Sequence, residues 1–274
     1  MISGHIHGWR SNDPAAMLKK RFSQNLIKDG NILRKMVSLA GITPGDTVVE
    51  VGAGQGDLTR AISRTAAAVI AVEVDRDMIA HLETLASEFS NVRIVFNDIL
   101  AVPITDLSLN HAVKVMGNIP YGITGPIIFK LITERSSIEC AFLTVQKEIG
   151  DRITAIPGTR AYGSLSVVCQ LVADVKVLMR LKPQVFVPPP KVESIYFSMR
   201  FREDAAYVDN ALMTFIRGAF SHKRKFMRHA LLERYPEPQV EELYEKMDFP
   251  RSVRAETLEP DIFRRMFEIL EGRE

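Results

Sequence analysis

Cysteine and long apolar runs are both scarce in this chain. Only two cysteines, Cys140 and Cys169, occur in 274 residues, and they do not form a Cys-x-x-Cys pair. A disulfide framework and a four-cysteine zinc site are therefore excluded. No apolar stretch approaches the ~20 residues of a membrane-spanning helix, and the first twenty residues lack the apolar core of a signal peptide. We expect a soluble cytoplasmic protein with no membrane partner.

Metal-ligand spacing and internal repeats are missing as well. The six histidines show no Glu-x-x-His or paired spacing, so we expect no metal. No fixed period or low-complexity tract is evident, which excludes a solenoid. With 46% hydrophobic and 25% charged residues, the composition is that of a globular protein. The length predicts two domains, or one domain with a sizeable appendage.

The net charge of +2 hides an uneven distribution of charge along the chain. Residues 1–35 carry seven basic and two acidic side chains, whereas residues 235–274 carry six basic and eleven acidic ones. A basic leading arm suits an anionic partner, and a solvated surface explains the charge equally well.

Strand and helix patterns alternate along the first two thirds of the chain. Buried strands are predicted over residues 47–51, 67–74, 92–96, 111–116 and 140–145, with helices over residues 78–89 and 127–133. This alternation predicts an α/β fold with a mostly parallel sheet and helices on both faces. Two later strands, over residues 167–179 and 194–201, should form an antiparallel pair at the sheet edge.

The periodicity changes to helical after residue 202. Leu212, Phe215, Ile216 and Phe220 recur at helical spacing, and a second such set follows near the end of the chain. We therefore divide the chain into a first domain, residues 1–202, and a small all-helical domain, residues 203–274.

The first predicted strand ends in a glycine-rich loop, Gly52-Ala53-Gly54-Gln55-Gly56. Glycine permits positive φ and lets a ligand approach the backbone closely. The loop is not Gly-x-Gly-x-x-Gly, and no Gly-Lys-Ser/Thr follows it, which excludes a P-loop. A purely structural turn remains possible for such a loop taken alone.

Acidic side chains follow the next two strands. Glu73 comes 21 residues after Gly52, where a carboxylate can accept both ribose hydroxyls of an adenosine-type cofactor. Asp98 follows the third strand and can accept from an adenine amino group, although a turn-forming aspartate is the alternative. Because these features end successive strands, we expect them to face one crevice above the carboxyl edge of the sheet.

The most informative motif is Asn118-Ile119-Pro120-Tyr121, after the fourth strand. The lone pair of adenine N6 is delocalised into the ring, so methyl transfer to it requires that the pair be localised. The Asn118 oxygen and the Ile119 carbonyl can accept its two N–H bonds in a turn fixed by Pro120, while Tyr121 stacks on a flipped base. A plain proline turn is the alternative.

With these motifs in place, the sequence resembles the adenine-N6 dimethyltransferase family that acts on ribosomal RNA, in its small-subunit branch. The resemblance runs nearly end to end. It covers residues 22–26, 50–59, Glu73, Asn97-Asp98, residues 118–121, 146–148, 157–158, 162–167 and 186–192.

The resemblance implies a Rossmann-like class I methyltransferase sheet, with S-adenosylmethionine as methyl donor. It implies two methyls on each of two adjacent adenosines in the hairpin near the 3′ end of small-subunit rRNA, with the free rRNA or an immature small subunit as partner. We expect a monomer and a role in small-subunit maturation.

The resemblance also assigns roles to single residues. Gln24, Asn25 and Ile27 would line the cofactor, with Gly52 and Gly54 beneath it; Asn118 would border both the cofactor and the reacting edge. Phe186 would form a second aromatic wall opposite Tyr121, unless it is a core phenylalanine.

The sequence departs from the family pattern at two places: Ala53 replaces a frequent proline, and Leu26-Ile27 replaces the more usual Phe-Leu. Both are apolar exchanges, which we expect to alter fine cofactor contacts rather than activity.

Two basic clusters are candidates for contacts with RNA phosphates, which add salt-dependent affinity without reading sequence. They are Lys19, Lys20 and Arg21 in the leading arm, and Lys223, Arg224, Lys225 and Arg228 in the helical region. A solvated helix face is the alternative for the second cluster.

Three other functions fit part of these patterns. The large-subunit rRNA methylase branch shares the catalytic motifs, although residues 157–167, the triple proline before Lys191 and the size of the helical domain favour the small-subunit branch. An RNA-binding assembly or transcription factor on the same scaffold would not need an intact Asn118. A nicotinamide-dependent dehydrogenase leaves residues 118–121 unexplained.

Overall fold

The computed structural model describes residues 25–108, 111–203, 208–222 and 225–272. Six of the predicted site residues lie outside these ranges. They are Lys19, Lys20, Arg21, Gln24, Lys223 and Arg224.

A seven-stranded sheet, with strand order β4-β3-β2-β5-β6-β9-β7, forms the centre of the molecule. Its strands are β2 (Thr47–Val51), β3 (Ala68–Glu73), β4 (Val92–Phe96), β5 (Val113–Asn118), β6 (Ile138–Gln146), β7 (Ala173–Leu181) and β9 (Ser194–Phe201). Strands β2 to β6 pair in parallel, while β9 pairs antiparallel with β6 and β7. The predicted sheet, including the antiparallel pair at one edge, is confirmed.

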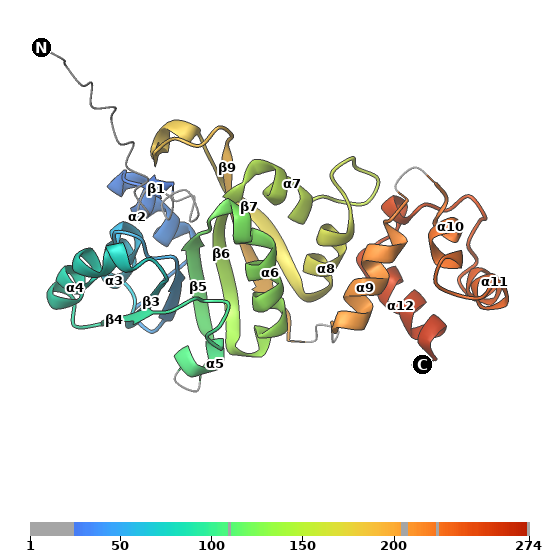
Figure 1. The fold of residues 1–274 in the computed structure, drawn as a ribbon, viewed down its shortest axis with the longest axis horizontal. Coiled ribbons are helices and arrows are strands. Elements are labelled where there is room, and N and C mark those ends of the chain that lie inside the picture. Colours follow the sequence, from blue (N-terminus) through green and yellow to red (C-terminus); the bar gives the residue numbers. More distant parts are fainter. Residues whose placement is uncertain (1–24, 109–110, 204–207, 223–224, 273–274) are drawn as a thin grey trace, which may run out of the picture.

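Helices cover both faces of the sheet (Figure 1). One face packs against α2 (Gly30–Leu39) and α3 (Asp57–Ser63), with α4 (Ile79–Glu88) beside them. The other packs against α5 (Ile104–Leu107), α6 (Thr124–Thr133), α7 (Lys147–Ile153) and α8 (Ser164–Val172). All five residues of β2 are buried for this reason, which explains why four of them are β-branched and why apolar and polar residues do not alternate along the strand.

The strand predicted over residues 167–179 is wrong in its first part. Residues 164–172 form helix α8, and the strand begins only at Ala173. The Ser166 hydroxyl accepts a hydrogen bond from the Gly163 backbone N–H at 3.1 Å, which helps to start the helix. A short apolar run does not distinguish a buried strand from a helix that is covered on all sides, and α8 is covered by the sheet on one side and by later helices on the other.

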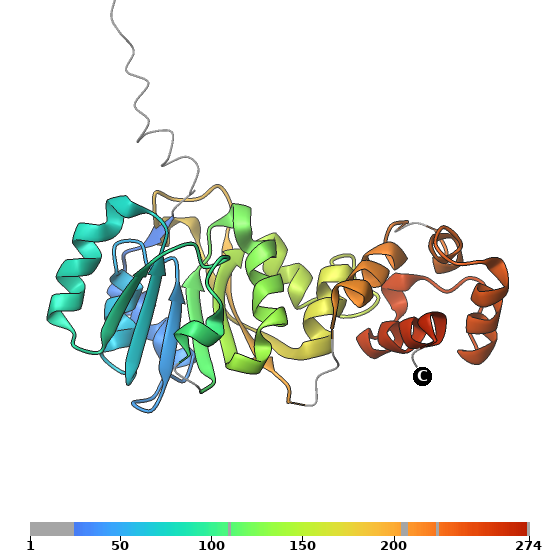
Figure 2. The ribbon, with the colours of Figure 1, turned by 60° about the horizontal axis from the view of Figure 1, so that its bottom comes forward.

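The chain after residue 208 is helical, as predicted. It contains α9 (Asn210–Ala219), α10 (Met227–Leu232), α11 (Glu237–Lys246) and α12 (Pro260–Glu271), which lie at the opposite end of the molecule from α4 (Figures 1 and 2). Helices α9 and α12 pack on α8, and the Tyr162 hydroxyl donates to the Leu258 carbonyl at 2.8 Å. Buried side chains form one continuous cluster from the sheet into these helices. The division into two domains near residue 203 stays a prediction.

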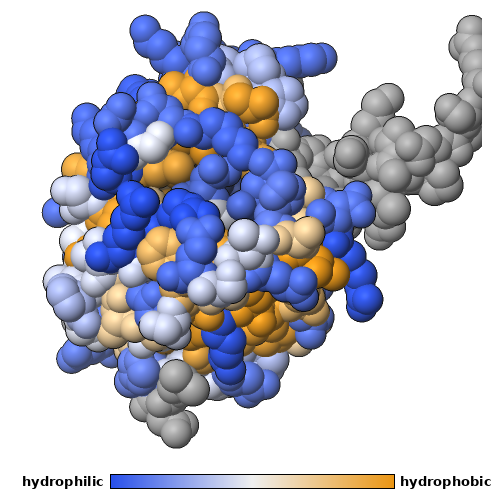
Figure 3. Space-filling view, turned by 90° about the vertical axis from the view of Figure 1, so that its left-hand side faces the viewer, coloured by the Kyte–Doolittle hydropathy of each residue, from blue (hydrophilic) through white to orange (hydrophobic). Residues whose placement is uncertain are grey.

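A second, two-stranded sheet joins distant parts of the chain. In it, β1 (Leu26–Ile27) pairs antiparallel with β8 (Phe186–Val187). On the side of the molecule that carries α3 and α4, apolar patches lie between projecting hydrophilic side chains (Figure 3). In the described ranges, no helix is long and apolar enough to cross a membrane.

Candidate active site

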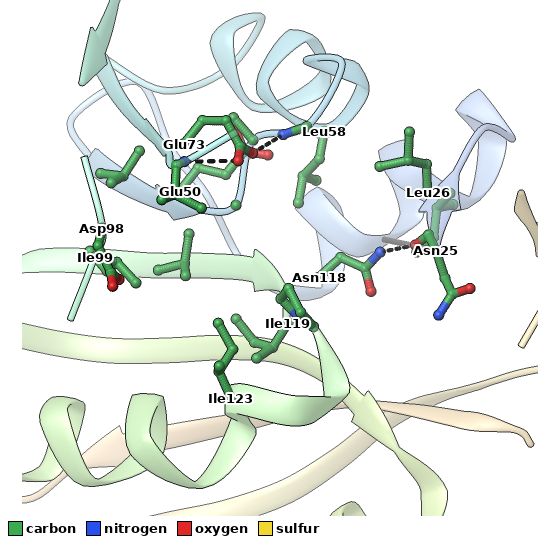
Figure 4. Close-up of a pocket in the computed structure, with 18 of the residues that line it drawn as sticks. Asn25, Leu26, Glu50, Leu58, Glu73, Asp98, Ile99, Asn118, Ile119 and Ile123 are labelled. Atoms are coloured by element: carbon green, nitrogen blue, oxygen red, sulfur yellow. Dashed lines mark hydrogen bonds between the residues drawn. The ribbon is translucent and has the colours of Figure 1, made fainter. Parts of the chain in front are cut away.

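The carboxyl ends of β2, β3 and β5, with the turn after β4, meet at a cavity of about 280 Å³. Most of the predicted site residues line it together (Figure 4). They are Asn25, Ile27, Gly52, Gly54, Glu73, Asp98, Asn118, Ile119, Pro120 and Tyr121. The single crevice expected from the strand ends is therefore confirmed.

The glycine loop after β2 forms the floor of the cavity. Gly54 has φ of +56°, and a Cβ atom built there would lie 2.8 Å from Cδ2 of Leu26. The positive φ favours glycine at this position, and a Cβ would in addition require the Leu26 side chain to shift. At Gly52, with φ of +73°, a Cβ would meet no atom within 4 Å, so the backbone borders open space.

Glu73 ends β3 and is already bound by the backbone. One carboxylate oxygen accepts from the Gly54 N–H at 2.7 Å, and the other accepts from the N–H groups of Val74 and Asp75, both at 2.8 Å. The side chain is only 3% exposed. Glu73 therefore holds the glycine loop against its own strand end, in addition to bordering the cavity.

Glu50 is a cavity residue that the sequence analysis did not select. It is the fourth of the five residues of buried β2, is 1% exposed, and its Oε2 has no hydrogen-bond partner within the described part of the chain. Burial raises the pKa of Glu50 to about 8, and the nearby carboxylates of Glu73 and Asp57 act in the same direction. The sequence feature that could have identified Glu50 is a single acid within a buried strand that leads directly into a glycine loop.

Asp98 lies in the turn after β4, with its side chain exposed at the cavity rim. Its Oδ1 accepts from the Leu100 N–H at 2.9 Å, so this aspartate does form a turn. The turn-forming role does not use both oxygens, and the residue still borders the cavity.

Asn118 ends β5, and its side-chain amide is held in one orientation. Its Nδ2 donates to the Asn25 carbonyl at 2.5 Å, which turns Oδ1 away from that bond (Figure 4). The next residue is anchored too, because the Ile119 N–H donates to the Thr144 carbonyl at 3.0 Å. The turn at residues 118–120 is thus fixed both through the side chain of its first residue and through the backbone of its second.

Tyr121 begins a short 3-10 helix (Tyr121–Ile123) directly after Pro120. Its ring borders the cavity, and its hydroxyl shares a hydrogen bond of 2.9 Å with the Ser194 hydroxyl. Burial raises the pKa of Tyr121, so the hydroxyl is protonated at neutral pH.

Phe186 is buried and is not itself among the residues that line the cavity. It is 2% exposed and belongs to the core cluster beneath α2, which also contains the cavity-lining residues Ile27 and Leu33. Its burial agrees with the alternative of a core phenylalanine, and its role as a second aromatic wall stays a prediction.

The two described residues of the second basic cluster, Lys225 and Arg228, lie in different surroundings. Lys225 is exposed. Arg228, in contrast, is bound by two carboxylates of α11, Glu237 and Glu241, each at 2.6 Å. These ion pairs would compete with a phosphate for the charge of Arg228, and its contact with RNA stays a prediction.

The carboxylates at the cavity do not form a metal-ligand set. Over the ranges that the structure describes, no group of three or more His, Cys, Asp or Glu side chains is placed to hold a metal ion.

Together, the parallel sheet, the glycine loop, the acids after successive strands and the asparagine-led turn define a class I, S-adenosylmethionine-dependent methyltransferase of Rossmann-like architecture. Solved structures agree. The chain is similar to a dimethyladenosine transferase from Plasmodium falciparum, with a TM-score of 0.77 and 26% identity over 88% of this chain and 95% of the other. It is also similar to the 23S rRNA methyltransferase ErmE, with a TM-score of 0.70 and 25% identity over 90% and 100% of the two chains.

Sequence comparison gives the family. The model of the ribosomal RNA adenine dimethylases matches residues 15–271, and the chain belongs to that family. Its relatives include proteins named ribosomal RNA small subunit methyltransferase A. The one from Clostridioides difficile (strain 630) is 35% identical over 89% of this chain and 88% of its own length. The one from Prosthecochloris aestuarii (strain DSM 271 / SK 413) is 40% identical over 80% and 83%.

Proposed function

We propose that this chain transfers methyl groups from S-adenosylmethionine to N6 of two adjacent adenosines in the 3′-terminal hairpin of small-subunit rRNA, giving N6,N6-dimethyladenosine. The observation that carries the proposal is the orientation of Asn118. Its amide nitrogen is held by the Asn25 carbonyl, so its oxygen is left to accept a hydrogen bond at the end of the cavity.

The residues around the cavity fit an adenosine-type methyl donor. The unpartnered, buried Oε2 of Glu50 suits an N–H donor of the ligand. Glu73 would accept from the ribose through the remaining capacity of its oxygens, and Asp98 would accept from the adenine amino group through its second oxygen. Asn25, Ile27, Gly52 and Gly54 would form the walls. When bound, the donor supplies an electrophilic methyl carbon on a sulfonium, which is a good leaving group.

The chain itself contributes position and hydrogen bonds to the reaction. Asn118 Oδ1 and the Ile119 carbonyl would accept the two N–H bonds of the target amine and so localise its lone pair. Pro120 fixes this turn, and Tyr121 would stack on the flipped base. The C–N bond forms as the carbon–sulfur bond breaks, and the proton leaves afterwards from the strongly acidic ammonium. No general base is needed.

We assign the RNA contacts to the basic residues that remain unpaired or lie outside the described ranges. Lys225 is exposed, and the other candidates are Lys19, Lys20, Arg21, Lys223 and Arg224. They would bind the rRNA, free or within an immature small subunit, with the helical region as one contact surface. Replacing Lys225 with Gln should flatten the salt dependence of RNA binding by about one phosphate contact. An equal effect of the Arg228→Gln variant would contradict this assignment.

A likeness to ErmE makes the large-subunit rRNA the competing substrate. The experiment is to incubate the protein with labelled donor and either small or large ribosomal subunits that lack the modification, and then to map the labelled nucleotides. We expect label on two adjacent adenosines of the small-subunit rRNA, and none with the Asn118→Ala variant. Label on the large-subunit rRNA would overturn the proposal.

A further inference from the structure

We propose that Ser194 is a positioning residue that fixes where the Tyr121 ring, on which the target adenine stacks, lies at the cavity. This inference rests on the proposed function, because Tyr121 is assigned there as the stacking surface. Among the described residues that line the cavity, Tyr121 is the aromatic one, and its side chain is partly buried. A ring next to a turn can swing about its Cα–Cβ bond unless a further contact holds its far end, and the shared hydrogen bond of 2.9 Å with Ser194 is that contact.

Ser194 is built as a rigid anchor. It is 0% exposed and is the first residue of β9, which lies between two other strands. Its Cα is in register with Gln146 of β6 and with Leu181 of β7. The residue before it is also held, since the Glu193 carbonyl accepts from the Lys147 N–H at 2.9 Å. The hydroxyl that meets Tyr121 therefore has little freedom to move.

The chemistry of the pair favours a bond that persists. A buried serine hydroxyl without a partner is costly, and Tyr121 supplies that partner. The tyrosine hydroxyl is protonated at neutral pH, so each group can donate or accept. The bond spans 73 residues of sequence and joins the turn after β5 to the start of β9. A stacking wall held in this way is ready before the base arrives, which lowers the entropy lost on binding.

A double-mutant cycle on methyl transfer to unmodified small subunits tests the inference. Ser194→Ala and Tyr121→Phe should each lower kcat about 3- to 10-fold, in line with the loss of one hydrogen bond, and should leave donor affinity within twofold. The double variant should be no slower than either single one. Ser194→Thr keeps the hydroxyl and should recover most of the rate. Additive losses, or a wild-type rate in Ser194→Ala, would overturn the inference.

Ser166 provides a matched control. It is also a 0% exposed serine whose hydroxyl makes hydrogen bonds, but to the backbone around α8 rather than to the cavity. Ser166→Ala should lower stability and should show no coupling to Tyr121→Phe. Coupling of equal size would mean that the cycle reports general loosening, and would count against Ser194.

A second readout separates this inference from the proposed function. With 3-fluorotyrosine at position 121 in the full chain, the fluorine lies next to the hydroxyl, and its ¹⁹F NMR signal should shift in Ser194→Ala but not in Ser166→Ala. Loss of labelling on both ribosomal subunits would refute the proposed substrate, while the fluorine signal would still decide whether Ser194 holds the ring. An unchanged signal in Ser194→Ala would refute the positioning role.

Discussion

The two halves of the cavity are built in different ways. The donor half consists of Glu50, the glycine loop, Glu73 and Asp98, and its contacts join neighbouring strand–loop units; the bond from the Gly54 N–H to Glu73, for example, spans 19 residues. The target half consists of residues 118–121. Asn118 is held from Asn25, 93 residues away, and Tyr121 from Ser194, 73 residues away.

This difference has a functional meaning. The strand-end residues of the donor half come together where the parallel sheet forms, and Asn25 and Ile27 of the β1 segment complete the cavity. The turn at residues 118–121 is tied by side-chain hydrogen bonds both to Asn25 and to Ser194 of β9. The chemistry-bearing half therefore depends on two distant segments, whereas most of the donor half depends on one sheet edge.

The largest expected effect is that of Asn118→Ala, which should impair the target half and leave the donor half intact. Asn118→Ala should lower kcat about 1,000-fold, because it removes an acceptor aimed at the reacting group. Donor affinity should change less than threefold, as measured by calorimetry. Asn118→Asp keeps an oxygen but loses the donor to the Asn25 carbonyl, and should lose about 100-fold. An aspartate variant as active as the wild type would show that the orienting bond is not needed.

The opposite effect, weaker donor binding with nearly unchanged kcat, is expected for Gly54→Ala. Gly54→Ala places a Cβ at positive φ and 2.8 Å from Leu26, so donor binding should weaken about 10-fold or more while kcat at saturating donor stays within threefold. Gly125→Ala in α6 is the control, because a Cβ there meets nothing within 4 Å. Parallel losses of kcat and donor affinity would mean that the two halves are not separable.

Glu50, in the donor half, should make the stability of the fold depend on pH. The pKa of Glu50 is about 8 in the fold because of burial, against an ordinary value of 4.5. The folded chain therefore keeps a proton that the unfolded chain releases, so stability falls as pH rises from about 4.5 to 8, with a slope of up to about 1.4 kcal/mol per pH unit. Urea unfolding of the donor-free protein at several pH values should show this slope, and Glu50→Gln should remove it.

A surface carboxylate supplies the comparison for that measurement. Glu83 is exposed on α4, and Glu83→Gln should leave the pH dependence as it is in the wild type. If Glu50→Gln and Glu83→Gln gave the same profile, burial would not be the cause of the slope.

The same contrast explains what could be predicted from the sequence. Strand β2, the glycine loop and α3 are adjacent in the chain, so local pattern was enough to predict that Gly52, Glu73 and Asp98 share a crevice. The motif at Asn118 was found because its residue types are informative. Its amide orientation was not predictable, since the carbonyl that sets it lies 93 residues away.

Contacts between separate elements are what local pattern does not reveal. Residues 167–172 have the pattern of a strand, but they belong to helix α8, which contacts with the sheet and with later helices bury on all sides. The burial of Phe186 beneath α2 and the pairing of Arg228 with the acids of α11 are likewise set by other elements.

The smallest expected effect is that of Asp98→Asn, at the rim of the donor half. Asp98 is exposed, and one of its oxygens is engaged by the Leu100 N–H. Asp98→Asn keeps an oxygen that can accept from an adenine amino group, so we expect donor affinity to fall only about threefold, as for a single solvent-exposed hydrogen bond. The loss should vanish for a donor analogue that lacks the 6-amino group, and Asp106→Asn, an exposed carboxylate on α5, should have no effect on either ligand. An equal loss for both ligands would mean that Asp98 supports the turn without touching the adenine, and the donor half would then be defined by the glycine loop, Glu50 and Glu73 alone.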